Sequence, residues 1–368
     1  MERERLKKAK RIVIKIGASV LTTKGLTLDE VWIKDFATQV SSLSKQGREI
    51  VIVSSGAIAS GMGLLGIKKR PRSLPEQQAC AAVGQGYLMK IYESYFNKNG
   101  FHAAQILLTW EDIRERRRYL NAENTLHALL ARKVIPVINE NDTVSVDEIK
   151  FGDNDKLSAL VANIISADLL IMLTDVDGLY IDEKKTVASV VKKLDAGIEK
   201  IACGTDKECS QGGMRTKLDA VKIAVNSGID CVIANGRHED VILGILNGKK
   251  IGTLFLSGEN KMQAKKRWIA YNARSQGRIF VDDGAKEALI KKNKSLLLCG
   301  VKKVEGTFIY GDVVMIADLN GNEFAKGLSN YSAGNLDKIK GMKTKEAEKI
   351  ISEDFYEEAV HRDNLVIL

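Results

Sequence analysis

Short apolar runs alternate with helical patterns through the first two thirds of the chain. Runs such as Ile50–Val53 and Leu169–Leu173 are apolar at every position, as in strands that are buried on both faces. Longer stretches between such runs, for example Leu28 to Gln46, carry apolar residues at helical spacing. This alternation predicts an α/β domain with a mostly parallel sheet that helices cover on both sides.

The pattern changes near residue 258. Residues 258–275 are polar and basic, and beyond them short strand-like runs are separated by glycine turns, which favours a small β-rich barrel. A chain of 368 residues is also too long for one ordinary core. The predicted strands of this part are 277–281, 295–298, 306–310, 312–316 and 323–327. We predict a catalytic domain at 1–258, a linker at 259–275, a β-rich domain at 276–356 and a C-terminal tail at 357–368.

Composition narrows the class of protein. The five cysteines are scattered without a Cys-x-x-Cys pair and the four histidines lie far apart, so we expect reduced thiols and no zinc site. No apolar run reaches the ~18 residues of a membrane span, and the charged N-terminus does not resemble a signal peptide. We therefore expect a cytoplasmic protein without a membrane segment. The net charge of +9 suits nucleotides, acidic metabolites or nucleic acid, and fits equally well a surface with a lysine excess.

Polar or small residues follow several of the predicted strands. The strand ends read Lys15-Ile-Gly17, Ser54-Ser-Gly56, Asn139-Glu-Asn-Asp142 and Thr174-Asp175. Because ligands collect at the carboxyl ends of parallel strands, these residues predict a binding site. A second polar cluster, Gly152–Asp155, opens an apolar helix pattern; its alternative reading is a helix cap supplied by Asp153 or Asn154.

Two further features suggest an anion site. The paired glycines in Gln211–Lys217 open a predicted helix, where free backbone N–H groups and the helix dipole favour a phosphate. Lys217 lies one turn into that helix, within reach of the same phosphate. Lys15 is an unexpected cation inside the apolar run Ile12–Ile16. The alternatives are a flexible turn at the glycines and a lysine that snorkels from the strand edge.

The quoted motifs together resemble those of the amino acid kinase family, and among its members those of the glutamate 5-kinases. The resemblance rests on 13–22, 53–59, 136–142, 152–155, 173–175 and 212–217, and on a stretch from Lys266-Arg-Trp268 onward that resembles a PUA domain. It implies a three-layer α/β sandwich with a mostly parallel central sheet, followed by a small β-rich PUA-like barrel. One departure is Ser210-Gln211, where the family usually has Gly-Thr.

The resemblance implies that ATP phosphorylates the side-chain carboxylate of L-glutamate, giving L-glutamyl 5-phosphate in the first step of proline synthesis. A carboxylate with a reference pKa near 4.3 is ionised at neutral pH, so the reaction needs no general base. The chemical problem is to bring an anion against a polyanion, which cations and positioning solve. We therefore expect Lys15 and Lys217 to be catalytic, aided by Mg²⁺ that is bound mainly to the ATP phosphates.

The remaining roles also follow from the resemblance. The residues expected to bind glutamate are Ser55, Gly56, Ala57, Asn139, Asp142, Asp153 and Asn154. The residues expected to bind ATP are Lys15, Gly17, Thr174, Asp175, Gln211, Gly212, Gly213, Met214, Arg215, Thr216 and Lys217. No metal ligand is assigned, although Asp155 could approach the metal. Asp142 and Asn154 are expected to hold the α-ammonium group of glutamate.

Partners are implied in the same way. Proline is expected as a feedback inhibitor, sensed by the loop Gly61–Gln78, and the chain is expected to form a homo-oligomer, a dimer or a tetramer. The PUA resemblance suggests RNA, with Trp268 among basic residues as a contact surface; the alternative is a solvated linker in which Trp268 is buried. Two rival functions remain: an acetylglutamate, aspartate or nucleotide kinase of the same fold, and an RNA-binding protein with a degenerate kinase domain.

Overall fold

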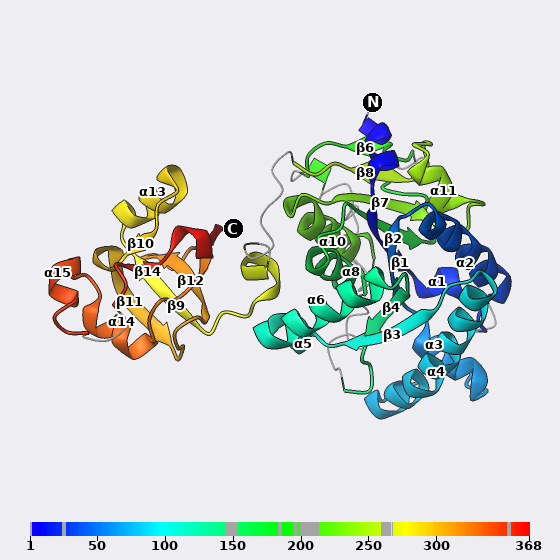
Figure 1. Cartoon of the computed structure of the whole chain (residues 1–368), viewed down its shortest axis with the longest axis horizontal. Helices are drawn as coiled ribbons and strands as arrows, with labels where there is room; N and C mark the ends of the chain where they lie inside the picture. Colours follow the sequence, from blue (N-terminus) through cyan, green and yellow to red (C-terminus); the bar gives the residue numbers. More distant parts are fainter. Residues whose placement is uncertain are drawn as a thin grey trace. The chain divides into compact units, whose positions relative to one another are not determined.

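The computed structural model describes residues 2–23, 27–144, 154–182, 186–194, 197–198, 213–258, 266, 268–351 and 355–368 (Figure 1). The chain divides into two compact units. The first holds Met1–Ile113 and Arg117–Lys261, and the second holds Met262–Leu368 with the short segment Arg114–Arg116. The division falls inside the stretch predicted as a linker.

The first unit is built on an eight-stranded sheet with the strand order β3-β4-β2-β1-β5-β7-β8-β6. Neighbouring strands pair in parallel, except that β7 and β8 are antiparallel. The strands are β1 Arg11–Ile16, β2 Glu49–Ser54, β3 Ala103–Leu108, β4 Ile135–Glu140, β5 Leu169–Thr174, β6 Val190–Val191, β7 Asp230–Asn235 and β8 Thr253–Phe255. The predicted, mostly parallel α/β sheet is thereby confirmed.

Helices cover both faces of this sheet, which makes three layers. The helices of the unit are η1 Glu2–Lys8, α1 Ala18–Leu21, α2 Glu30–Lys45, α3 Ala57–Leu64, α4 Leu74–Lys98, α5 Trp110–Arg114, α6 Arg116–Ala131, α8 Asn154–Ile164, α10 Met214–Asn226 and α11 Val241–Leu246. Helices α1, α2, α4 and α11 lie on one side of the sheet, and α8 and α10 lie on the other, where Figure 1 also draws α6.

Strand β1 shows how the sequence sets these layers. Successive side chains of a strand point to opposite faces. Ile12, Ile14 and Ile16 accordingly enter the core that Phe36 of α2 and Tyr92 of α4 complete. Lys15, one position out of that phase, points to the face that carries α8. The polar residue in the apolar run is thus directed toward the first turn of a helix, and its partner there is described below.

Two glycines allow α3 and α4 to pack closely behind the end of β2. A Cβ atom on Gly84 would lie 1.8 Å from the carbonyl oxygen of Ala57, and one on Gly61 would lie 1.8 Å from the carbonyl oxygen of Cys80. Both contacts are with backbone atoms, which cannot move aside without shifting a helix. Gly56, which precedes α3, has φ +100°, a left-handed value that favours glycine. The turn after β2 is therefore held in place by helix packing.

The second unit contains a five-stranded sheet, ordered β11-β9-β12-β13-β15, and a two-stranded sheet of β10 and β14. Its strands are β9 Gly277–Val281, β10 Leu296–Leu297, β11 Val301–Gly306, β12 Val313–Asp318, β13 Glu323–Leu328, β14 Glu358–Val360 and β15 Leu365–Ile367. Its helices are η2 Trp268–Asn272, α13 Asp283–Lys292, η3 Leu298–Gly300, α14 Ala333–Ile339, α15 Thr344–Ala347 and η4 Arg362–Asn364. The predicted β-rich character is confirmed.

Three details of this unit differ from the prediction. The prediction of a strand at 306–310 is wrong. Strand β11 ends at Gly306, whose φ of +91° turns the chain. Phe308 lies in the loop that follows and is buried in the core. The residues 301–306 were missed because they are mostly charged or polar. The stretch 357–368, predicted as a tail, supplies β14 and β15, which pair with β10 and β13.

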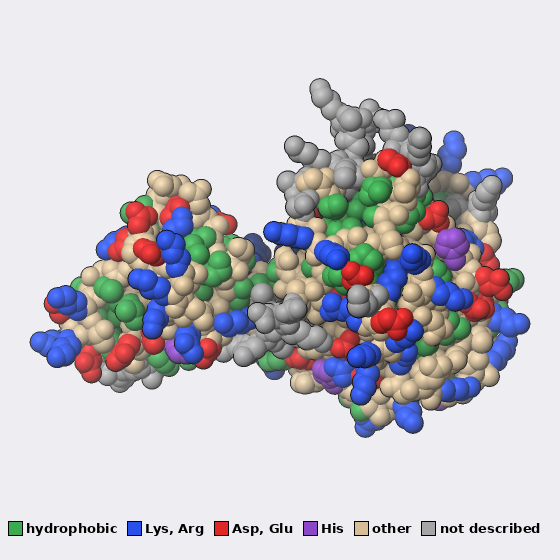
Figure 2. All heavy atoms as spheres, turned by 90° about the horizontal axis from the view of Figure 1, so that it is seen from above, with side chains coloured by type: hydrophobic (Ala, Val, Ile, Leu, Met, Phe, Trp, Pro, Cys, Tyr) green, Lys and Arg blue, Asp and Glu red, His purple; other side chains and the backbone are tan. Residues whose placement is uncertain are grey.

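Two global properties bear on the class of protein. Among the described residues, no helix has both the length and the apolar character that crossing a bilayer requires. On the face shown in Figure 2, Lys and Arg side chains are interspersed with Asp and Glu side chains. The excess of positive charge is therefore spread over the described part of that face rather than gathered in one patch.

The close approach of α3 and α4 gives a matched pair of substitutions. Gly84→Ala should lower the free energy of unfolding by about 1–3 kcal/mol, because the added methyl group overpacks the contact with Ala57. Gly86→Ala in the same helix meets no atom within 4 Å and should stabilise the protein by about 0.5–1 kcal/mol through helix propensity. Urea denaturation of both variants checks this; equal effects would show that the contact does not limit packing.

Candidate active site

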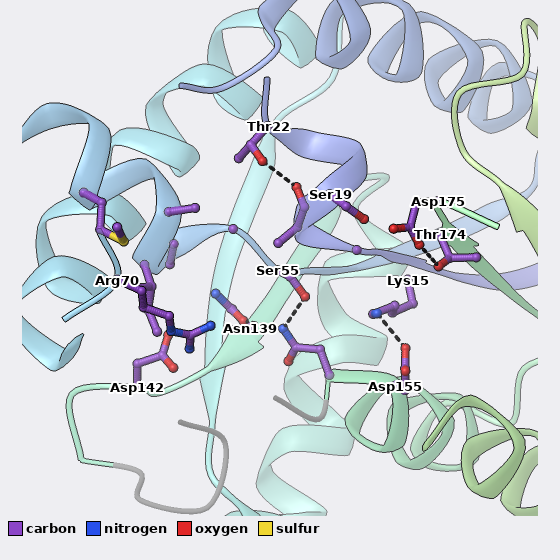
Figure 3. A pocket seen from close by; sticks show the side chains of 18 of the residues that line it. Lys15, Ser19, Thr22, Ser55, Arg70, Asn139, Asp142, Asp155, Thr174 and Asp175 are labelled. Atoms are coloured by element: carbon purple, nitrogen blue, oxygen red, sulfur yellow. Dashed lines mark hydrogen bonds and ion pairs between the residues drawn. The ribbon is translucent and has the colours of Figure 1, made fainter. Parts of the chain in front are cut away.

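A cavity of about 530 Å³ lies at the carboxyl ends of β1, β2, β4 and β5 (Figure 3). Eleven of the residues predicted to form the site line this cavity: Lys15, Gly17, Ser55, Gly56, Ala57, Asn139, Asp142, Asn154, Thr174, Asp175 and Lys217. The strand ends lie level because Ile16 pairs with both Ser54 and Leu173. The parallel register therefore gathers side chains from distant parts of the sequence.

A buried carboxylate between two lysines forms one end of the cavity. Lys15 Nζ lies 2.6 Å from Asp155 Oδ1, and Lys217 Nζ lies 3.3 Å from Asp155 Oδ2. The exposed fractions of the Lys15, Lys217 and Asp155 side chains are only 8%, 12% and 3%. Burial alone would raise the pKa of Asp155, but the two ammonium groups outweigh it and hold that pKa below its usual range. Two cations share one anion, which leaves this end positive.

Helix α10 brings Lys217 to this position. Gly213 is its N-cap residue, and Thr216 Oγ1 donates to the Gly213 carbonyl at 3.0 Å and to Asp155 Oδ2 at 3.1 Å. The first turn of α10 is thereby fastened to α8. Gly213, Met214, Arg215 and Thr216 are not among the residues that line the cavity, whereas Lys217 is. The predicted site residues Asp153, Gln211 and Gly212 lie outside the described residues.

On the nucleotide side of the predicted site, Thr174 and Asp175 follow β5. Both line the cavity, and Thr174 Oγ1 donates to Asp175 Oδ1 at 3.1 Å. Figure 3 draws them on the same side as Lys15, away from Asp142.

Asn154, at the start of α8, is held in place by hydrogen bonds from its amide nitrogen. Its Nδ2 donates to the Ser54 carbonyl at 3.3 Å, to Ser55 Oγ at 2.9 Å and to Asn139 Oδ1 at 3.0 Å. Its Oδ1 is buried without a hydrogen-bond partner among the described residues. Asn139 also lines the cavity; its Oδ1 accepts from Asn154 and its Nδ2 donates to Gln85. The side chain of Asn139 thereby helps to orient Asn154.

Asp142 forms the opposite end of the cavity, beside Arg70. Figure 3 draws these two side chains together, away from Lys15 and Asp155. Burial raises the pKa of Asp142 to about 6, although the positive charge of Arg70 acts in the other direction. A buried carboxylate with a raised pKa is poorly compensated and favours a cationic partner.

Sequence reasoning missed Ser19, Thr22, Met62 and Arg70, which also line the cavity. Arg70 stands in the run Lys68-Lys69-Arg70, and nothing in that run marks which cation turns inward. It does belong to the stretch Gly61–Gln78, predicted as a loop that senses proline; the structure shows that only residues 65–73 form a loop, because α3 and α4 take up the two ends of that stretch.

The described residues contain no group of three His, Cys, Asp or Glu side chains that could hold a metal ion. Asp155, the one carboxylate considered for that role, is engaged by Lys15 and Lys217.

Comparison with known proteins agrees with this fold. Residues 10–235 match the amino acid kinase family and residues 277–351 match the PUA domain. The chain therefore belongs to the amino acid kinase family. It is 48% identical to glutamate 5-kinase of Thermoanaerobacter sp. (strain X514) over 363 residues, covering 97% of this chain and 98% of that protein.

Two further glutamate 5-kinases show the same relationship. That of Caldanaerobacter subterraneus subsp. tengcongensis is 49% identical over 97% of this chain and 98% of its own length. That of Geobacter sp. (strain M21) is 46% identical and covers the whole of both chains. Within its family the chain thus belongs with the glutamate 5-kinases that carry a C-terminal PUA domain, which confirms the resemblance seen in the motifs.

The raised pKa of Asp142 predicts a pH-dependent cost to the fold. The pKa rises from about 3.9 in the unfolded chain to about 6 in the folded one. The contribution of Asp142 to the free energy of unfolding is therefore fully present below the pKa of the unfolded chain, and it is lost as the pH rises through the pKa of the folded protein. At pH 7.5, Asp142→Asn should raise the free energy of unfolding by up to about 3 kcal/mol, and by much less at pH 4.5.

Urea denaturation without ligands at the two pH values measures this difference. The control is Asp175→Asn, which changes an exposed carboxylate of the same cavity and should alter stability little at either pH. If Asp142→Asn raised the free energy of unfolding equally at both pH values, the cost would not come from the ionised carboxylate.

Proposed function

We propose that this protein transfers the γ-phosphoryl group of ATP to the side-chain carboxylate of L-glutamate, forming L-glutamyl 5-phosphate in the first step of proline synthesis. The observation that carries the proposal is the charge layout of the cavity. Lys15 and Lys217 flank Asp155 at one end, and Asp142 lies at the other. One end thus suits phosphates and a reacting carboxylate, and the other suits an ammonium group.

The reaction needs positioning and charge neutralisation. The substrate carboxylate is ionised at neutral pH and attacks the γ-phosphorus, while the bond to the β–γ bridging oxygen breaks and ADP leaves. No proton has to move. Lys15 and Lys217 offset the repulsion between the two anions and stabilise the charge on the transferring group. Asp155 holds both ammonium groups and so fixes where that positive charge is placed.

We propose Mg²⁺ as the companion of ATP rather than as a resident metal. The described residues offer no ready-made cage of ligands, so its ligands would come chiefly from the phosphates. When bound, it would lower the negative charge of the nucleotide. Thr174 and Asp175, which follow β5, are the proposed protein contacts on the nucleotide side.

The other end of the cavity suits the head group of an amino acid. Asp142 and Asn154 Oδ1, which has no hydrogen-bond partner among the described residues, are two acceptors that an α-ammonium group would satisfy. Arg70 places a guanidinium group beside Asp142, and we assign to it the α-carboxylate of the substrate. Glutamate carries one charge for each of the three polar positions: ammonium, α-carboxylate and side-chain carboxylate.

The same head group exists in proline, so proline competing at Asp142 and Arg70 is our proposal for feedback inhibition. A dimer or tetramer, and a cytoplasmic location, remain expectations from the family. RNA binding has less support: Trp268 is only 4% exposed, so its ring offers little surface to a base. Arg278 of the basic stretch forms ion pairs with Glu305 and Glu323.

The proposed reaction is tested by trapping its product. The protein is incubated with ATP, Mg²⁺, hydroxylamine and, in turn, glutamate, N-acetylglutamate, aspartate or no acid. Acyl hydroxamate should form with glutamate and not with the other acids. Lys217→Met, assayed at saturating ATP, should lower kcat by about 10²-fold or more because a fixed charge is lost. Product with another acid in place of glutamate would assign a different kinase reaction, and no product with any acid would contradict kinase activity.

Arg70 is tested with a substrate that lacks the group assigned to it. Arg70→Gln should raise the KM for glutamate about tenfold or more, the effect of losing a charge-assisted hydrogen bond. It should leave the KM for 4-aminobutyrate, which has no α-carboxylate, nearly unchanged. Arg72→Gln is the control, because Arg72 lies in the same loop but does not line the cavity. Equal losses with both substrates would show that Arg70 does not bind the α-carboxylate.

A further inference from the structure

Four side-chain amides form a hydrogen-bonded chain that ends at the cavity. Gln85 of α4 donates from Nε2 to Gln105 Oε1 of β3 at 3.2 Å. Gln85 Oε1 accepts from Asn139 Nδ2 of β4 at 2.9 Å, and Asn139 Oδ1 accepts from Asn154 Nδ2 at 3.0 Å. Asn139 and Asn154 line the cavity, whereas Gln85 and Gln105 do not. This chain of amides thus connects side chains outside the cavity to side chains that line it.

The backbone fixes the direction of this chain at two points. A carbonyl oxygen only accepts and a peptide N–H only donates. Asn154 lies against the Ser54 carbonyl, so the amide nitrogen of Asn154 must face it. Asn139 lies against the Glu140 N–H at 2.9 Å, so the oxygen of Asn139 must face that group. With both ends fixed, Asn139 Nδ2 points outward and requires an acceptor, which Gln85 Oε1 supplies.

The direction of the chain decides what the cavity offers a substrate. The nitrogen of Asn154 is used by three protein acceptors, so the atom left for a ligand is the buried Oδ1. Ser55 Oγ accepts from Asn154, which leaves the Ser55 hydroxyl proton to donate elsewhere. The cavity therefore presents an acceptor that fits an ammonium group beside a donor that fits a carboxylate.

We propose that Gln85 is a positioning residue for the amino acid substrate, acting through Asn139 on Asn154 and Ser55. Without the Gln85 oxygen, the buried Asn139 nitrogen would have no acceptor among the described residues, and a rotation of Asn139 would relieve that cost. Such a rotation removes the acceptor on which Asn154 depends. Gln85 thereby keeps Asn154 Oδ1 and the Ser55 hydroxyl in the orientation that binds an α-amino acid, and this assignment rests on the proposed function.

The first test replaces Gln85 by a residue of similar shape without hydrogen-bonding groups. Gln85→Met should raise the KM for glutamate about tenfold or more and leave the KM for ATP within about twofold. The ratio of the KM for glutarate, which lacks the ammonium group, to the KM for glutamate should fall by a similar factor. The matched control is Gln39→Met in α2, which also removes a buried glutamine amide but lies outside the site. It should change neither constant.

A second test inverts the direction of the chain and does not depend on Gln85→Met being stable. Gln85→Glu retains an acceptor for Asn139, and the Gln105 amide can turn to donate to the new carboxylate. Asn139→Asp retains the acceptor for Asn154, and Gln85 can turn to donate to it. Each single variant should raise the KM for glutamate by less than about fivefold, because a flipped amide replaces each lost hydrogen bond.

The double variant Gln85→Glu/Asn139→Asp sets two carboxylates against each other where no flip supplies a donor. Its KM for glutamate should exceed the product of the single effects by about tenfold or more. A rise in the KM for glutamate that merely equals the product of the two single rises would overturn the proposal. An unchanged KM for glutamate in Gln85→Met, or equal rises for glutamate and ATP, would overturn it as well. Wild-type protein that forms no glutamyl hydroxamate would overturn the proposed function and this inference together, whereas active wild type with those outcomes overturns the inference alone.

Discussion

The pairing of Asp155 with Lys15 and Lys217 is the interaction on which the rest of the site depends. A buried carboxylate is costly unless charges and hydrogen bonds compensate it. Here the compensation joins three elements, because Lys15 comes from β1, Asp155 from α8 and Lys217 from α10. The same pairing keeps two ammonium groups close together, which would otherwise repel each other. The same ion pairs therefore hold α8 and α10 against the sheet and fix the positions of the two ammonium groups that we propose as the catalytic charge.

The opposite end of the cavity is built in the opposite way. Asp142 is buried with no compensation comparable to that of Asp155, and its pKa is raised for this reason. The ionised form of Asp142 therefore costs stability, and under the proposed function the ammonium group of the substrate would offset that cost. The two carboxylates therefore differ in their partners: Asp155 is paired with two lysines and links three elements, whereas among the described residues the charge of Arg70 is what offsets the burial of Asp142. Both carboxylates are buried, so the difference between their pKa values comes from their charged partners.

Much of this arrangement could be predicted from the sequence, since it depends on backbone periodicity. Apolar runs ending at Gly17, Ser54, Asn139 and Thr174 predict which residues meet, because parallel strands in register end at one edge. Other features depend on contacts that no local pattern records. Arg70 enters the cavity from a loop with three adjacent cations. The strand at Val301–Gly306 was missed because its charged residues face solvent on an open sheet, where the alternation of apolar residues is weak.

The amide chain shows why the orientation of side chains, more than their proximity, escapes prediction. The sequence places Asn139 and Asn154 at the same edge, yet it cannot say which atom of each amide faces the cavity. That choice is made by the Ser54 carbonyl and the Glu140 N–H, which lie at the ends of β2 and β4 of the sheet. Since these backbone groups cannot reverse, the donors and acceptors of the cavity are set before any ligand arrives. Preorganisation of this kind reduces the ordering cost of binding, and it makes the proposed recognition of the amino acid head group depend on the fold as much as on the residues that would touch the substrate.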